Sequence, residues 1–118
     1  MQPRSWRVSV QDILEAIAMI QRVTRGLEFE GFAGDILIRS TVLLHLMIIG
    51  EASANVPVVV QNQASGIPWA LMRGIRNRVA HAYFHIDLLI VWDVVMTQLD
   101  PLVPQLQALL ESDFELGR

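Results

Sequence analysis

Two side chains suited to acid–base and phosphate chemistry stand five residues apart in the chain, Arg76 and His81. Histidine can give or take a proton near neutral pH, and arginine keeps its charge while offering phosphate a planar fork of donors. Asn77 follows the arginine directly, and Tyr83 lies two residues past the histidine. Fixed donors stabilise the charge that grows on phosphate oxygens in a transition state. These residue types favour phosphodiester cleavage, and with RNA, whose 2′-OH is the nucleophile, no metal is strictly required.

The spacing has a geometric consequence if the segment is helical. Asn77 and His81 then lie one turn apart on one face, and Arg73 precedes Asn77 by another turn. Arg76 and His81 are separated by about 140° around an ideal helix. One helix therefore cannot bring both side chains to the same atom, and a partner helix or a second copy of this helix must complete the site.

The distribution of charge points to the same segment. The chain has nine arginines, no lysine and twelve acids, for a net charge of −3, yet residues 52–86 contain no Asp or Glu. That window carries a formal charge of +3, which leaves −6 for the remainder, so a local surface can attract anions. Alternatively, its arginines pair with acids on neighbouring helices. The basic and histidine residues of the window are Arg73, Arg76, Arg78, His81 and His85.

Length and composition bound the class of protein. With 118 residues, 53% of them apolar, we expect a single domain over residues 1–118 and no disordered chain. The absence of cysteine excludes a disulfide scaffold, a thiolate zinc site and a cysteine nucleophile. Residues 1–10 do not resemble a signal peptide, and the apolar run Thr41–Gly50 is too short to span a bilayer. We therefore expect a cytoplasmic protein without a membrane segment.

Hydrophobic periodicity predicts an all-α fold, a bundle of four main helices plus a short one. The first helix is predicted from Val8 to Leu27, with a turn at Gly31 and Gly34. Asp35 is the predicted N-cap of a second helix over Ile36–Asn55. Between Val42 and Ile49 this helix is apolar nearly all round, which indicates a bundle centre or a subunit interface.

The second half of the chain is divided by proline. A short helical turn is predicted at Val58–Gln61, and Pro68 suits the first position of a helix that runs through Tyr83. Asp87 is the predicted N-cap of the last helix, which begins near Leu88. Pro101 and Pro104 bend or interrupt that helix before it ends near Glu111.

Several further side chains have a chemical and a structural interpretation. Glu51 can pair with an arginine of the motif helix, and Gly50 marks a close helix crossing. His45 is expected in the core or lining a cleft. His81 and His85 have a spacing that can bind zinc, but no third ligand is placed, so we expect no metal and no cofactor. Trp69, Trp92, Met47 and Met72 are expected to pack in the core, and Arg4 and Arg7 to be solvated.

In this order and at this spacing, the motifs resemble the HepT-like branch of the HEPN superfamily over nearly the whole chain. The most specific stretch is Met72–Asn77, which leads to His81 and Tyr83. The other matching segments are Asp12–Ile17, Gly26–Phe29 with Phe32 and Asp35, Ile48–Ala52, Ile67–Trp69 and Val91–Trp92. The sequence departs from many relatives at Ala82, and at Leu44 and His45, where relatives often carry a polar pair.

The resemblance implies an antiparallel four- to five-helix HEPN bundle that dimerises through its motif-bearing helices. It also implies a metal-independent endoribonuclease toxin with Arg76 and His81 as catalytic residues. Supporting or phosphate-binding roles fall to Asn77, Arg73, Arg78 and Glu51. A cognate minimal nucleotidyltransferase antitoxin is expected to neutralise the toxin by attaching AMP to Tyr83. The alternative is a non-catalytic HEPN module that binds a nucleotide or associates with the transferase.

Overall fold

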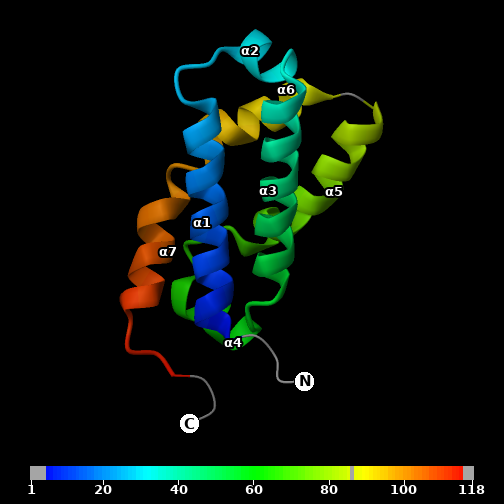
Figure 1. Cartoon of the computed structure of the whole chain (residues 1–118). Helices are drawn as coiled ribbons and strands as arrows, with labels where there is room; N and C mark the ends of the chain where they lie inside the picture. The colour runs from blue at the N-terminus through cyan, green and yellow to red at the C-terminus, as the bar shows by residue number, and fades with distance from the viewer. Residues whose placement is uncertain (1–4, 86, 116–118) are drawn as a thin grey trace.

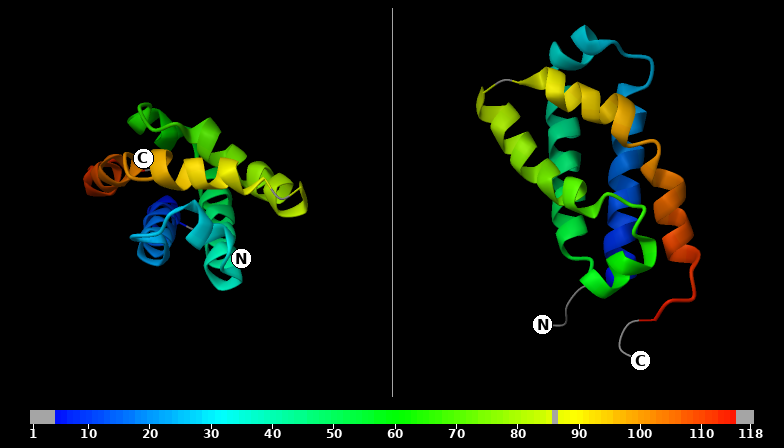
Figure 2. Two further views of the ribbon diagram at one scale, coloured as in Figure 1. Left: turned by 90° about the horizontal axis from the view of Figure 1, so that it is seen from above. Right: turned by 180° about the vertical axis from the view of Figure 1, so that it is seen from behind.

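The computed structural model describes residues 5–85 and 87–115, without the side chains of residues 81–85. Every regular element in this part of the chain is helical, which confirms the all-α prediction. The long helices α1 (Trp6–Thr24) and α3 (Ile36–Ala54) run antiparallel, α5 (Trp69–His85) packs across α3, and α7 (Leu102–Glu111) packs on α1 (Figure 1). Between α5 and α7 the chain passes over one end of the bundle as α6 (Leu88–Asp93) and η2 (Val94–Gln98) (Figure 2).

The first helix is shifted relative to its prediction. α1 begins two residues before Val8, because the hydroxyl of Ser5 accepts a hydrogen bond from the Arg7 amide and caps the first turn. It ends at Thr24 rather than Leu27, and Gly26 then turns the chain with a φ of +76°, a conformation that favours glycine. The apolar stripe of α1 forms the centre of the core, with Val10, Ile13, Ile17 and Ile20 fully buried.

A short helix lies where only a turn was predicted. α2 (Phe29–Ala33) contains Gly31, a poor helix former, so its sequence gave no helical signal. Phe32 is fully buried and stacks on Trp92 of α6 with ring centroids 5.1 Å apart. This tertiary contact compensates for the weak local propensity.

The second predicted helix is confirmed within one residue. A carboxylate oxygen of Asp35 accepts from the amides of Leu37 and Ile38 at 2.9 and 3.2 Å, so the predicted cap is present. Within the apolar stretch between Val42 and Ile49, Leu44 is 56% and Met47 40% exposed, so the helix is not enclosed on all sides as the centre of a bundle would be. By length and composition alone, α3 is the described helix that could cross a membrane, and 39% of its apolar stretch is buried within the bundle. It is longer than the apolar run Thr41–Gly50 predicted from sequence.

The proline-divided half largely follows its prediction. α4 (Val58–Gln61) and α5 lie where helix was expected, and the last helix is interrupted between Gln98 and Leu102. The short η1 (Asn62–Ala64), which continues directly from α4, was not predicted. Asp87 occupies the N-cap position and the helix begins at Leu88, as predicted. Its side chain makes no capping hydrogen bond, however, and its backbone (φ −94°, ψ 69°) is not in the extended conformation that is usual for a cap.

Most predictions for the individual packing residues are confirmed. Trp69 and Met72 are buried, and the Trp69 indole donates to the Ala64 carbonyl at 3.1 Å, while Trp92 is half-buried against Phe32. Met47 is 40% exposed, so its assignment to the core is wrong. Arg7 is not simply solvated, because its guanidinium donates to three carbonyls of the C-terminal segment. Arg4 lies outside the described residues.

Candidate active site

Helices α3 and α5 touch backbone to backbone at Gly50. A Cβ atom at this position would lie 3.0 Å from both the backbone nitrogen and the Cβ of Arg76. Only glycine leaves room for α5 to approach this closely without a shift of the neighbouring helix. The predicted close crossing is confirmed, and it places Arg76 directly beside the residue that follows Gly50.

That following residue, Glu51, forms an ion pair with Arg76. Nη1 of the guanidinium donates to Oε1 of the carboxylate, and each side chain is 53% exposed. An ion pair this open contributes at most about 1 kcal/mol to stability. Its main consequence is positional, because one nitrogen of the guanidinium is held and no described contact engages the others. The prediction that Glu51 pairs with an arginine of the motif helix is confirmed.

The exposed side of α5 next to this pair carries two more of the predicted residues. Arg73 lies one turn earlier, and its Nη1 donates to Oε1 of Gln61 at 3.0 Å. Gln61 is itself fixed, because its amide nitrogen donates to the Val56 carbonyl at 2.9 Å. Asn77 is exposed one turn after Arg73. Three predicted donors therefore share one side of α5.

Arg78 does not join this group. Two residues along a helix turn a side chain by about 200°, so Arg78 leaves α5 on the side opposite Arg76. It is exposed, and no acid pairs with it in the described part of the chain. A phosphate contact from Arg78 would need a substrate or a second chain that reaches around the helix.

The backbone of His81 and Tyr83 belongs to the last turns of α5, and their side chains lie outside the described part of the structure. The predicted zinc-binding spacing of His81 and His85 lies outside it too. Among the side chains that are described, no group of three or more His, Asp or Glu residues is arranged to hold a metal ion. The ring of His45 is half-buried, with Nδ1 2.7 Å from the Thr41 carbonyl of its own helix.

The charge pattern of the acid-free window is partly neutralised. Arg76 pairs with an acid from α3, as the structural alternative expected, whereas the partner of Arg73 is the neutral amide of Gln61. Of the three arginines, Arg76 alone forms an ion pair within the described residues. Positive charge therefore remains on the exposed surface of α5, next to a guanidinium that is held in place.

An exposed apolar stripe on α3 leads up to this site. Leu37, Leu44, Met47 and Ile48 share one face of the helix with Glu51 and are 36–77% exposed. Beside Glu51 the stripe borders a groove of about 220 Å³ that also includes Asp12 of α1. The sequence left open whether the apolar middle of α3 was core or interface, because residues that are apolar on all sides do not show which side is buried. The structure assigns these four to the surface.

Comparison with known proteins gives one family throughout. A family model described as "Ribonuclease HepT-like" matches residues 13–109. A probable ribonuclease HepT of Thermococcus cleftensis is 39% identical over 92 residues, which cover 78% of this chain and 84% of the relative. Putative RNases of Methanocaldococcus jannaschii and Caldanaerobacter subterraneus are 33% and 27% identical, over 80% and 91% of this chain and 87% and 96% of theirs. None of the solved structures gives a significant match.

Proposed function

Because the chain belongs to the ribonuclease HepT-like family, we propose that it is a metal-independent endoribonuclease whose site is shared by two copies. The observation that carries the proposal is the state of Arg76. Its guanidinium is half-exposed and held at one nitrogen by Glu51, beside a glycine crossing that fixes the helix. A donor that is positioned in advance and still open to solvent can meet a phosphate without reorganisation.

The proposed reaction moves two protons and exchanges one bond at phosphorus. The His81 ring of one copy takes the proton from an RNA 2′-OH, and the 2′ oxygen attacks the adjacent phosphorus. The P–O5′ bond breaks, and the leaving 5′ oxygen receives a proton from His81 of the second copy. Arg76 stabilises the charge on the non-bridging oxygens, while Asn77 and Arg73 bind or orient the flanking phosphate. The products are a 2′,3′-cyclic phosphate and a 5′-hydroxyl.

The dimer is supported by geometry and by the surface of α3. Arg76 and His81 are about 140° apart around one helix, so a two-fold pair of motif helices is needed to surround one phosphate. The α3 stripe, which includes Leu37, Leu44 and Ile48, is exposed beside Glu51. Contiguous exposed apolar surface of this kind marks an interaction site. A second copy that covers the stripe would bring the two α5 helices close together.

The proposal extends to regulation by a partner. A minimal nucleotidyltransferase antitoxin would attach AMP to Tyr83, two residues past His81, as part of a cytoplasmic toxin–antitoxin pair. The added phosphate is negative and bulky, so it would compete with RNA for Arg73 and Arg76. The support for this step is the position of the only tyrosine of the chain, in the last turns of the motif helix.

The decisive experiment is incubation of the purified protein with total RNA in the presence of a chelator. The wild type and the control His85→Ala should cleave RNA, because the mechanism gives His85 no role. His81→Ala, with fold and oligomeric state checked, should lose cleavage. Undiminished cleavage by His81→Ala contradicts the mechanism. No cleavage by the wild type, together with a tight complex with the transferase, favours the non-catalytic binding module instead.

The shared site has its own test. Leu44→Glu places a charge in the middle of the α3 stripe and should give a monomer by light scattering, with loss of cleavage. Leu89→Glu is the matched control, because Leu89 is 65% exposed on α6, outside the stripe. A Leu44→Glu protein that remains dimeric and active would rule out the α3 stripe as the interface.

A further inference from the structure

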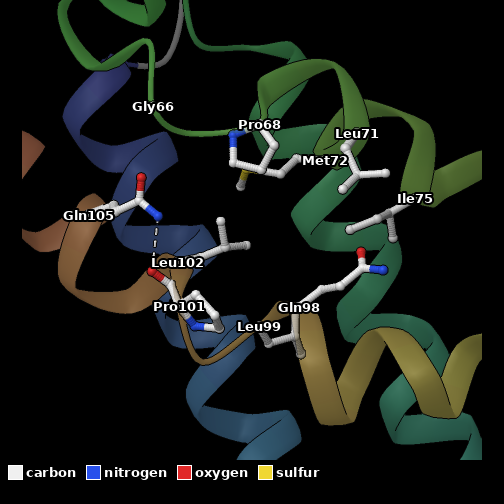
Figure 3. A pocket seen from close by; sticks show the side chains of 10 residues that line it. All are labelled: Gly66, Pro68, Leu71, Met72, Ile75, Gln98, Leu99, Pro101, Leu102 and Gln105. Atoms are coloured by element: carbon white, nitrogen blue, oxygen red, sulfur yellow. Dashed lines mark hydrogen bonds between the residues drawn. The ribbon is translucent and has the colours of Figure 1, made fainter.

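Helix α5 presents different chemistry on opposite sides. On one side, Leu71 and Ile75 line a pocket of about 320 Å³ together with Leu102 of α7 (Figure 3). None of the described residues around this pocket is charged, so it offers nothing to a phosphate. Arg73 precedes Ile75 by two residues, and a turn of about 200° places its side chain on the far side of the helix. The partner that Arg73 has there is therefore relevant to anion binding.

That partner is Gln61, the last residue of α4. Nη1 of Arg73 donates to Oε1 of Gln61 at 3.0 Å, and Nε2 of Gln61 donates to the Val56 carbonyl at 2.9 Å. If the amide were turned over, its NH₂ group would face the donors of the guanidinium and its oxygen would face a carbonyl oxygen. The two hydrogen bonds therefore allow one orientation of the amide, in which its acceptor is directed at Arg73.

The segment that carries Gln61 is anchored in the core. Val60 is fully buried and Val56 is 2% exposed. The backbone amide of Gln61 donates to the Pro57 carbonyl at 3.0 Å, which closes the turn between them. A side chain held by a fixed acceptor has already lost part of its rotamer freedom, so binding does not have to remove it. Arg73 is restrained in this way before any RNA arrives.

The partner of Arg73 also leaves its charge intact. Glu51 places a carboxylate against Arg76, whereas Gln61 offers an amide oxygen without net charge. A glutamate in place of Gln61 would neutralise Arg73 and would set a carboxylate against the Val56 carbonyl, where neither group is a donor. The two arginines are three residues apart and are neighbours on the helix surface. They are close enough to contact successive phosphates of one strand.

We propose that Gln61 is a positioning residue for RNA binding, which restrains Arg73 without neutralising it, so that Arg73 binds the phosphate next to the one at Arg76. The inference rests on the proposed RNA site and adds to it a residue from α4, outside the motif helix. Its signature is electrostatic. For a single strand, each phosphate neutralised by the protein contributes about −0.7 to the slope of log K against log salt concentration.

The test measures binding of a fluorescent 2′-O-methyl oligouridine, which lacks the 2′-OH nucleophile, by anisotropy at several salt concentrations. Gln61→Glu should make the salt slope shallower by about 0.7, the equivalent of one phosphate. Gln61→Leu keeps the charge of Arg73 but frees its side chain, so the slope should be retained while affinity falls about fivefold. Both variants lose the bond to Val56, so the difference between them isolates the charge beside Arg73.

Two controls separate this contact from a general effect of charge or folding. Gln63→Glu adds the same charge two residues further along, where Gln63 borders a groove with Leu109 of α7, and should leave the slope unchanged. Arg73→Ala should lose the same 0.7 of slope, about one phosphate, and adding Gln61→Leu to it should have no further effect. Circular dichroism verifies that each variant is folded.

Four results would overturn the inference: an unchanged slope in Gln61→Glu, an equal loss of slope in Gln63→Glu, additive effects of Gln61→Leu and Arg73→Ala, or no binding of the probe by the wild type. The outcome is distinguishable from that of the ribonuclease proposal, because the probe is not cleaved. A wild type that binds the probe through Gln61 and Arg73 but cleaves no RNA would contradict the ribonuclease alone. A wild type that cleaves RNA, with an unchanged slope in Gln61→Glu, would contradict the role of Gln61 alone.

Discussion

Two arginines of this chain, Arg7 and Arg76, each lie beside an acid, Glu115 and Glu51 respectively, but differ in their other contacts. At the junction of α1 with the C-terminal segment, Arg7 donates to the carbonyls of Leu110, Ser112 and Phe114 at 2.6–3.0 Å. Its guanidinium also lies 4.3 Å from the centre of the Trp6 ring, and its side chain is 30% exposed. At the α3–α5 crossing, the described contacts of Arg76 engage one nitrogen, and its side chain is 53% exposed.

The difference lies in what occupies the donors. Main-chain carbonyls cannot move away without local unfolding, so Arg7 is committed to structure. The carboxylate of Glu51 engages one nitrogen of Arg76, so the other donors of that guanidinium stay open to a phosphate while the side chain is held. The sequence predicts an exposed side chain at both places, and the surrounding backbone separates the structural arginine from the one that is available to substrate.

The largest expected effect is on catalysis at Arg76. Arg76→Ala removes the guanidinium but keeps the Cβ that packs against Gly50, so the fold should be retained. Loss of one transition-state donor typically lowers the rate by about 10²–10³-fold, and we expect this loss in cleavage of total RNA. The free energy of unfolding, measured with urea, should fall by less than about 1 kcal/mol.

The control for this change is Arg78→Ala, two residues further along α5 on the opposite side. It removes the same charge from the same helix, so it separates a general electrostatic effect from a positioned contact. Cleavage by Arg78→Ala should fall by less than about tenfold, with a weaker salt dependence of RNA binding. Equal losses in the two variants would mean that the Glu51-held position of Arg76 has no special role.

The opposite result is expected at Arg7. Arg7→Ala removes three charge-assisted hydrogen bonds and the contact with the Trp6 ring, which together should lower the free energy of unfolding by about 2–3 kcal/mol. Cleavage per folded molecule should be unchanged at a temperature where the variant is folded. A variant with normal stability and reduced cleavage would reverse the roles assigned to the two arginines.

Local sequence signals predicted most of the elements and the contact between α3 and α5 at Gly50 and Glu51. The Asp35 cap, the start after Pro68 and the Gly50–Glu51 crossing follow from residues adjacent in sequence, and these predictions are confirmed. The sequence did not show which arginine Glu51 would meet, since three lie within six residues. The close approach of Arg76 to Gly50 decides it.

The wrong predictions share a physical cause: each outcome depends on contacts with segments that are distant in the sequence. Arg7 was expected in solvent, but its acceptors are carbonyls 103–107 residues away, and a sequence does not show where main-chain atoms will lie. Met47 was expected in the core, but in a helix that is apolar all round no periodicity distinguishes the buried from the exposed side. Helix α2 was missed because its Phe32 stacks on Trp92 of α6, a contact between elements that the local sequence does not show.

The last and smallest expected effect concerns the crossing that positions Arg76. In Gly50→Ala the new methyl group would lie 3.0 Å from the Arg76 backbone nitrogen and Cβ, so α5 must move by a few tenths of an ångström. We expect about 1–2 kcal/mol of destabilisation and a loss of cleavage larger than that stability change explains.

Gly74→Ala is the matched control in the same helix pair, because a Cβ there meets nothing within 4 Å. It should raise stability by about 0.5–1 kcal/mol through helix propensity and leave cleavage unchanged. If urea denaturation and RNA cleavage respond alike in both alanine variants, the tight approach at Gly50 does not position Arg76, and the contrast between the two arginines rests on exposure alone.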